Sequence, residues 1–359
     1  MLNPGERRVS SQDTSAGAPT VQRPVMDPIP MSPDLEGRAG RRGVIRRTLQ
    51  FLLRRSTRWQ QLEAVFDDGS KFWRVCRGIL YRLALLPMLT MLIASALVYT
   101  RTHPSQPAVE PDPSAVGCYY QPVDMLSEDG RHLEGWLVPA LSAHDVLLMH
   151  DGALHLRRPA VVLAHDFGQT QQQMLPLVRP LNEKGWVVLV VGLRGAGTAT
   201  PVGQTLGLNE SMDIKAAVAL LRRQRFVDGS HITLVGVGSG ANAALLAADR
   251  DPAVAAVVLD SPAETGEDAI AAHINSHNLW LAWLNPLCKL AFEIGYGLDV
   301  RDLDMEHYQP TLESRPIFLL RPPTGAEAEI SPDSVQQIVD FLDNACPTHQ
   351  EEANTDSAE

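Results

Sequence analysis

The stretch between Arg82 and Arg101 constrains this chain most, because its 18 residues carry no charge and are mainly Leu, Met, Ile, Val and Ala. A helix of that length is close to the minimum that crosses the hydrocarbon core of a bilayer. Residues 79–81 extend the apolar run, since the long side chain of Arg82 can reach the interface. We therefore predict a transmembrane helix over residues 83–100. The alternative is a buried helix of a soluble domain, but the segment has no polar stripe.

Charge is distributed unequally on the two sides of this segment. Residues 1–101 hold 16 Lys and Arg against 8 Asp and Glu, whereas residues 102–359 hold 15 against 34. Basic flanks stay in the cytoplasm, so we expect a cytoplasmic N-terminus and an extracytoplasmic main domain. The apolar run begins too late for a cleaved signal peptide, which indicates a signal anchor. The acidic main domain argues against nucleic acid as a partner, because phosphate binding needs a basic face.

Composition divides the chain further. Residues 1–40 are rich in Pro, Gly and Ser and are predicted to be disordered. Residues 41–82 mix basic and apolar side chains, which suits the anionic inner leaflet, although a cytoplasmic helix that binds nothing has the same pattern. Residues 101–117 contain several prolines and are interpreted as a stalk. We expect one folded domain over residues 118–346 and an acidic tail over residues 347–359.

Short apolar runs alternate with helical patterns after residue 118. Such an order predicts an α/β fold with a doubly wound, mostly parallel sheet that helices cover on both faces. A hairpin comes first, with strands at 119–126 and 132–138. The further strands are expected at 160–164, 187–191, 232–235, 254–259 and 316–320, and the helices at 172–184, 212–223, 241–248 and 331–344.

A glycine-rich turn, Gly236-Val237-Gly238-Ser239-Gly240, follows one of the buried strands. A sharp strand-to-helix turn that presents a nucleophile needs small residues two places before and after its apex. Gly236 and Gly240 meet that need and place Gly238 at the apex, with a positive φ that glycine tolerates. If Ser239 were the apex, Val237 would stand where the turn is most crowded. Ser239 is therefore interpreted as a serine at the start of a helix.

Several segments, in order, resemble the α/β-hydrolases, most of all the bacterial serine-aminopeptidase-like and dienelactone-hydrolase-like members. Besides the glycine-rich turn, residues 160–168 (AVVLAHDFG) are similar to the strand and loop that supply one oxyanion-hole amide. Residues 185–197 (GWVVLVVGLRGAG) look like the next strand with its Arg-Gly-x-Gly loop, and residues 254–262 (VAAVVLDSP) like the strand after the turn. The resemblance covers roughly residues 118–344 and implies an α/β-hydrolase fold with a helical cap and a nucleophile–histidine–acid triad.

The chain departs from that family's pattern at the nucleophile and in the oxyanion loop. The nucleophile position is Gly238. In the loop, His165 is followed by Asp166 where the family has glycine. The next residue, Phe167, would supply the oxyanion-hole amide, and a carboxylate beside it opposes the negative charge that the hole stabilises. His165 itself is expected to be structural.

The acid and the base also depart from the pattern. The family's acid follows the strand expected at 316–320, and the candidates here, Glu327 and Glu329, do not have the usual spacing. The family's histidine follows one more strand, whereas only His349 remains here, inside the acidic tail. The resemblance therefore implies a degenerate triad, in which no residue is assigned a catalytic role.

No pattern indicates a metal or another cofactor. His273 and His277 are four residues apart, but no third ligand or metalloprotease glutamate accompanies them. Residues 263–312 form the expected cap, which is rich in apolar residues. Such a cap can roof a pocket, contact the membrane, hold a partner or simply pack over the edge of the sheet.

Three functions remain open at this point. The first is a membrane-anchored, catalytically degenerate α/β-hydrolase-fold protein that binds a small molecule or a protein. The second is a divergent serine hydrolase that acts on acyl esters or peptides through Ser239. The third is a structural membrane protein whose basic N-terminal region is the functional part. Glycine at the apex of the turn favours the first function, and serine there favours the second.

Overall fold

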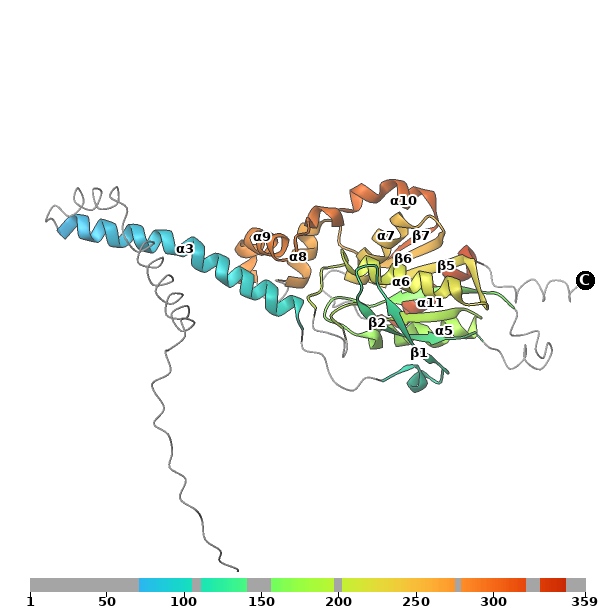
Figure 1. The fold of residues 1–359 in the computed structure, drawn as a ribbon. Helices are drawn as coiled ribbons and strands as arrows, with labels where there is room; N and C mark the ends of the chain where they lie inside the picture. Colours follow the sequence, from blue (N-terminus) through green and yellow to red (C-terminus); the bar gives the residue numbers. More distant parts are fainter. Residues whose placement is uncertain are drawn as a thin grey trace, which may run out of the picture. The chain divides into compact units, whose positions relative to one another are not determined.

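The domain is built on a seven-stranded sheet, which Figure 1 shows in the computed structural model. The structure describes residues 71–104, 111–140, 156–196, 202–274, 279–320 and 330–346. The sheet order is β1-β2-β4-β3-β5-β6-β7, in which β1 and β2 are antiparallel to their neighbours and the remaining pairs are parallel. The strands are β1 (Gln121–Leu126), β2 (His132–Val138), β3 (Arg158–Ala164), β4 (Val187–Val191), β5 (Val227–Val237), β6 (Val254–Asp260) and β7 (Ile317–Leu320). The mostly parallel α/β sheet predicted from the alternating pattern is confirmed.

Helices cover both faces of the sheet. Because side chains alternate along a strand, Val162 of β3 joins one hydrophobic core and its neighbour Val161 joins the other. The first core includes α6 (Glu210–Arg223) and α7 (Ser239–Arg250), and the second includes α5 (Leu175–Glu183) and α11 (Pro332–Ala345). Strands β3 and β4 are buried along their whole length, as expected for central strands covered on both sides.

Most elements differ from the prediction by one or two residues at their ends, and two differ by more at one end. The helix expected from residue 172 begins as a 3-10 turn, η4 (Gln171–Met174), and becomes α5 only at Leu175, because Pro176 lacks an N–H and suits the first turn of a helix. Strand β5 starts five residues earlier than expected, at Val227. Its first part is polar, so a search for apolar runs misses it.

The cap lies between β6 and β7 and is helical in its described parts. A third hydrophobic cluster, in which Ile270, Phe292 and Leu303 are buried, holds these helices together. The cap elements are α8 (Gly266–Ile274), η5 (Leu279–Leu284), α9 (Asn285–Tyr296), η6 (Val300–Leu303), η7 (Met305–Tyr308) and α10 (Gln309–Ser314).

One long helix, α3 (Lys71–Thr102), precedes the domain and is longer than the span predicted over residues 83–100. Within it, Trp73–Thr102 is long and apolar enough to cross a membrane. The part of the helix from Tyr81 onward belongs to the same compact unit as the domain.

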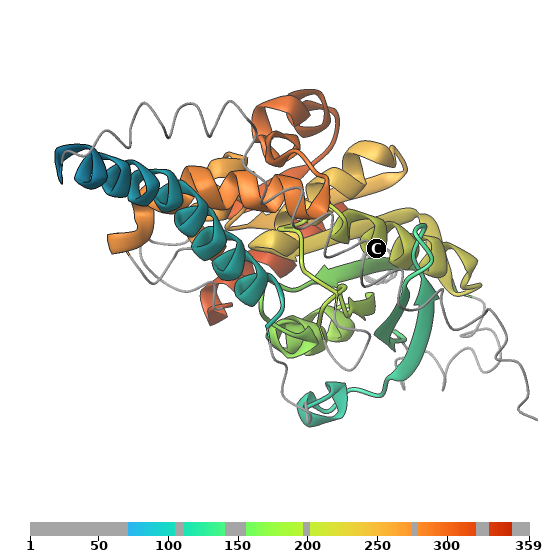
Figure 2. The same ribbon diagram turned by 60° about the vertical axis from the view of Figure 1, so that its left-hand side comes forward.

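The last turns of α3 pack against the cap. Ala94 and Val98 are buried in the cluster that also contains Phe292, and Figures 1 and 2 both show the end of α3 beside the cap helices. The hydroxyl of Tyr296 donates a hydrogen bond to Thr102 Oγ1 at 2.7 Å. Residues 101 and 102, which were expected to open the stalk, are therefore the end of a packed helix.

The second half of the predicted stalk is also folded. A 3-10 turn, η2 (Pro113–Val116), is capped by the Asp112 carboxylate and is followed by Gly117 in the left-handed conformation. Other predictions lie outside the described residues: the disordered residues 1–40, the basic segment up to residue 70, the acidic tail over residues 347–359, and the side chains of His277, Glu327, Glu329 and His349.

Candidate functional site

Gly238 is the apex of a sharp turn between β5 and α7. Its φ of 55° and ψ of −118° form a conformation that side-chain-bearing residues rarely adopt. A β-carbon on Gly236 would lie 2.2 Å from the carbonyl oxygen of Gly240, and one on Gly240 would lie 2.4 Å from that of His165. The turn therefore presses three backbone segments together, which is why it needs small residues on both sides of Gly238. Ser239 is the first residue of α7 and is buried.

The Asp166 carboxylate accepts hydrogen bonds from the two backbone amides beside this apex. Phe167 N donates to Asp166 Oδ1 at 2.6 Å, and Ser239 N donates to the same oxygen at 2.8 Å. The resemblance assigns the Phe167 amide to the oxyanion hole, and the second amide of such a hole belongs to the residue after the apex, here Ser239. A β-carbon on Gly238 would lie only 2.0 Å from Asp166 Oδ1. The carboxylate therefore occupies both the amide pair and the space that a side chain at the apex would need.

His165 holds the oxyanion loop and is not available as a base. Its ring is fully buried, and Nδ1 donates to the carbonyl oxygen of Asp166 at 2.9 Å. Nε2 accepts a hydrogen bond from the backbone amide of Leu193 at 3.2 Å. Because one nitrogen faces an acceptor and the other a donor, the ring is a neutral tautomer fixed at both ends. Burial also lowers the pKa of His165, so the ring stays uncharged.

Two further titratable side chains lie near Asp166. His273 Nε2, from cap helix α8, is 3.9 Å from Asp166 Oδ1, and its ring contacts the Phe167 ring at a centroid distance of 5.3 Å. Asp260 ends β6 and is buried, and its carbonyl oxygen accepts the Gly238 amide at 2.8 Å. Burial, together with the charge on Asp166, raises the pKa of Asp260 against the opposing hydrogen bond from Ser261. The site thus gathers two carboxylates and one imidazole.

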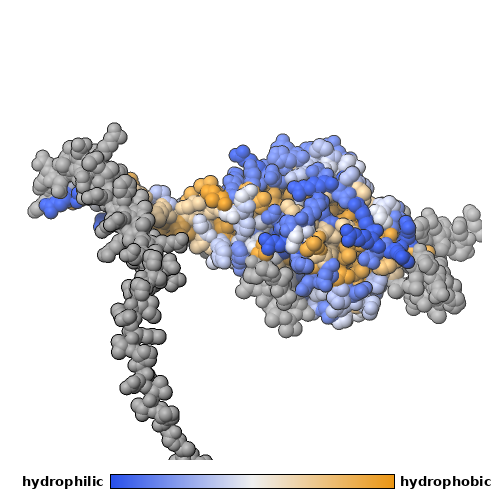
Figure 3. Space-filling view, in the orientation of Figure 1, coloured by the Kyte–Doolittle hydropathy of each residue, from blue (hydrophilic) through white to orange (hydrophobic). Residues whose placement is uncertain are grey.

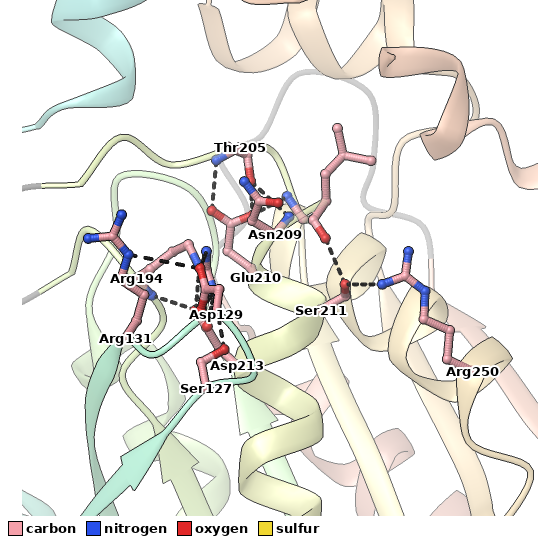
Figure 4. A network of polar contacts seen from close by, with 12 residues as sticks. Ser127, Asp129, Arg131, Arg194, Thr205, Asn209, Glu210, Ser211, Asp213 and Arg250 are labelled. Carbon is pink, nitrogen blue, oxygen red and sulfur yellow. Dashed lines mark hydrogen bonds and ion pairs between the residues drawn. The ribbon is translucent and has the colours of Figure 1, made fainter. Parts of the chain in front are cut away.

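A buried ion-pair network supports the loop that follows β4, and Figure 4 shows it from close by. Arg194 Nη2 lies 2.6 Å from Asp213 Oδ1, and Arg194 Nη1 lies 2.8 Å from Asp129 Oδ2. Burial alone lowers the pKa of Arg194, but its hydrogen bonds to Asp213 and Asp129 outweigh that effect and hold its pKa above the ordinary value. Arg194 is therefore a permanently charged bridge between the hairpin turn, the β4 loop and α6, with a structural role.

The neighbouring loop, residues 204–208, presses on the start of α7. Glu210 is buried and accepts a hydrogen bond from Thr205 N at 2.7 Å, which Figure 4 shows, and another from Gly207 N at 2.9 Å. A β-carbon on Gly207 would lie 2.8 Å from the carbonyl oxygen of Ser239. Gln204 also accepts the amide of Gly168 at 2.7 Å. This loop therefore braces both the turn and the oxyanion loop.

Some of these residues were predicted from the sequence and others were not. Asp166 and Gly238 were predicted, but His273 was considered only as a metal ligand, because no local motif connects a cap helix to the strand-to-helix turn at Gly238, the elbow. Asp260 had a weak signal, since it is the polar residue that ends a buried strand. Among the residues that the structure describes, no three His, Cys, Asp or Glu side chains lie together as a metal site. A pocket of about 160 Å³ lies at the start of α8 and is lined by residues such as Lys289, not by the elbow.

Comparison with known proteins concerns the fold and not the details of the site. The profile of the family described as serine aminopeptidase, S33, matches residues 156–309. The structure of the Pyrococcus furiosus esterase Pf2001 is similar, with a TM-score of 0.50 and 16% identity over 68% of this chain and 97% of that one. The α/β hydrolase GrgF from Penicillium sp. has a TM-score of 0.44 and 16% identity, covering 63% of this chain and 99% of that one. No curated protein sequence matches this chain.

Four observations point to one fold: the sheet order, the glycine-rich turn between β5 and α7, the helical cap between β6 and β7, and the profile match. The predicted resemblance is thereby confirmed at the level of the superfamily. The domain that starts near Cys118 has the α/β-hydrolase fold, and its residues 156–309 resemble the serine aminopeptidase, S33, family.

Proposed function

We propose that this protein is a membrane-anchored α/β-hydrolase-fold protein that binds a ligand or a partner and does not hydrolyse substrates by the serine mechanism. The observation that carries the proposal is the position of the Asp166 carboxylate. Its Oδ1 accepts the amides of both Phe167 and Ser239 and fills the space next to Gly238.

Acyl transfer at such an elbow needs a nucleophile on the apex and two amides free to stabilise an oxyanion. Glycine at position 238 supplies no nucleophile. The amide pair is bonded to a carboxylate, and a second anion in the same place would meet charge repulsion. The serine of the alternative, Ser239, stands one residue past the apex and is only 4% exposed. These features favour binding over hydrolysis.

The two carboxylates also determine which charge a ligand can carry at this site. Asp166 and Asp260 lie at the same edge of the sheet, and burial, together with the charge on Asp166, raises the pKa of Asp260. Anionic ligands such as free carboxylates are therefore disfavoured at the elbow. We expect a neutral or cationic small molecule, or a protein segment with hydrogen-bond donors, as the ligand.

The membrane part of the proposal rests on α3 and on the flanking charges. Trp73–Thr102 is suited to span a bilayer by length and composition, and the basic residues before it favour a cytoplasmic N-terminus. The α/β-hydrolase-fold domain is then held on the extracytoplasmic side.

The test is the rate of nitrophenyl acetate hydrolysis by the full chain in neutral detergent. The wild-type chain and Gly238→Ser are compared with the double variant Asp166→Ala/Gly238→Ser. We expect wild type and Gly238→Ser at the buffer rate, because wild type has no nucleophile at the apex and, in the variant, the displaced Asp166 carboxylate stays close enough to the amide pair to repel an oxyanion. The double variant frees the amide pair and is expected to reach at most roughly 10³-fold over water, the level that amides provide without a triad.

His273→Ala in the double-variant background is the control for a base supplied by the cap. A rate increase of about 10⁴-fold or more that His273→Ala abolishes would mean that a complete catalytic set is present. Wild-type hydrolysis that Ser239→Ala removes would favour the divergent serine hydrolase instead. Either result contradicts the proposed function.

A further inference from the structure

The uncharged segment of α3 includes residues that pack against the cap. No charged residue stands between Arg82 and Arg101. The stripe of α3 that packs on the cap starts at Met91 and ends at Thr102. Residues 83–90 lie between Arg82 and this contact, and residues 79–81 extend the apolar run when Arg82 reaches the interface. At about 1.5 Å per residue, residues 79–90 cover about 18 Å, well short of a hydrocarbon core of about 30 Å.

Moving the span toward the N-terminus does not resolve this overlap. Arg74, Arg77 and Arg82 would then enter the bilayer, where charged side chains are unfavourable. A membrane-spanning α3 must therefore keep residues 91–100 within the bilayer. Because those residues pack on the cap, part of the cap has to lie at the same depth.

The outer face of the cap is apolar where this placement requires it. Trp283, Leu290 and Ile294 are 62%, 45% and 69% exposed. Their spacing of seven and four residues places them along one side of the η5–α9 segment. Cys288 and Phe292, on the other side of α9, are buried in the cap core. Helix α9 thus has an inner apolar face that packs on the protein and an outer one without a protein neighbour among the described residues.

This outer face continues the apolar surface of α3. Figure 3 shows orange residues along the exposed part of α3 and at α9. Outside α3, six large hydrophobic side chains are exposed in the described part of the chain, and three of them are these cap residues. An apolar surface of this kind marks an interaction site more often than scattered single residues do.

We infer that the cap is immersed in the outer part of the bilayer beside α3, with Trp283, Leu290 and Ile294 against lipid. This inference rests on the proposed membrane anchoring. Residues 263–312 hold 8 Asp and Glu against 2 Lys and Arg, so the cap meets the hydrocarbon of neutral phospholipids and not an anionic headgroup surface. Phe167 packs against the same hydrophobic cluster. The cap therefore connects the lipid-facing surface to the oxyanion loop.

The test is fluorophore quenching in the full chain reconstituted in phosphatidylcholine vesicles. Cys76→Ser serves as the background, since the three other cysteines are buried. An environment-sensitive fluorophore is attached to Ile294→Cys, with Leu290→Cys as a second position in case the first fails to fold. Leu86→Cys marks the membrane span, and Asp333→Cys, exposed on α11, is the solvent control.

We expect a nitroxide on the lipid acyl chain to quench the fluorophore at positions 294 and 86, and iodide to quench it only at position 333. Quenching of position 294 by iodide and not by the nitroxide, while position 86 is still quenched from the lipid, would overturn the immersion of the cap and leave the anchor intact. Iodide quenching of both positions 294 and 86 would overturn the anchor itself.

Discussion

Asp166 and Gly238 occupy one space, so their substitutions are predicted to be strongly coupled. Asp166→Ala removes the acceptor of two amide hydrogen bonds of 2.6 and 2.8 Å. Hydrogen bonds to a charged group contribute about 1.5–3 kcal/mol each. The Asp166 side chain is 13% exposed, so water can replace part of the loss, and repulsion with Asp260 is relieved. A destabilisation of about 3 kcal/mol is therefore expected.

Gly238→Ser places a β-carbon 2.0 Å from Asp166 Oδ1 and forces the carboxylate out. The variant therefore loses the same two hydrogen bonds. In addition, a non-glycine residue at a φ of 55° is strained, which costs about 1–3 kcal/mol. The expected destabilisation is about 4–5 kcal/mol. In the double variant the carboxylate is already absent, so the cost should remain about 4–5 kcal/mol. The summed destabilisation of the two single variants should therefore exceed the destabilisation of the double variant by about 3 kcal/mol.

The assay is urea unfolding of the full chain in neutral detergent, followed by tryptophan fluorescence for wild type, both singles and the double. Asp166→Asn is the matched variant that keeps an acceptor oxygen and loses only the charge, and it should lie between wild type and Asp166→Ala. Additive costs, within about 0.5 kcal/mol, would refute the argument, because they would mean that the two residues do not share the space.

Three further outcomes follow from buried charges and from the flanking sequence. Burial raises the pKa of Asp260, so its ionised form costs stability at neutral pH; Asp260→Asn should raise the thermal midpoint at pH 7, and this gain should shrink as the pH falls toward the ordinary aspartate pKa of 3.8. A rise in the thermal midpoint of Asp260→Asn that becomes larger as the pH falls would contradict this prediction. Arg194→Ala leaves Asp213 buried without its cation and should cost about 3–5 kcal/mol in unfolding experiments, whereas Arg179→Ala removes an exposed pair and should leave the midpoint unchanged. A reporter fused after Glu359 should be active only outside the cytoplasm, and activity inside would contradict the predicted orientation.

The sheet was predictable because its central strands are short apolar runs between helical patterns. β4 matches the expected residues 187–191, and β3 and β6 extend the expected runs by only one or two residues. The polar start of β5 was not predictable in this way. Val227 pairs with Arg158, a register shift follows, and residues 228–231 are not buried, so nothing there demands apolar side chains.

The apex at Gly238 was predictable because backbone crowding acts over two residues on each side, within reach of sequence spacing. The position of the Asp166 carboxylate was predictable only in part. Sequence places an acid beside the oxyanion hole, but its hydrogen bond to Ser239 N joins residues 73 positions apart, which no local pattern encodes. The same holds for His273, whose helix has no fixed register relative to the sheet until the cap is packed.

The end of α3 shows a different limit of sequence analysis. Apolar side chains at positions 91, 94 and 98 suit lipid and a protein core equally well, so hydropathy does not separate the two environments. The hydrogen bond from Tyr296 to Thr102 and the burial of Ala94 reveal the packing on the cap. The helix therefore continues where a stalk was expected.

The most direct test of the central claim, that the elbow does not act as a serine nucleophile site, is labelling of the full-length wild-type chain with a fluorophosphonate probe. Such a probe reports an activated serine, so a chain with Gly238 at the apex and Asp166 on both oxyanion-hole amides should remain unlabelled, as should Ser239→Ala. Labelling of wild type that Ser239→Ala abolishes would contradict the account and identify Ser239 as a working nucleophile.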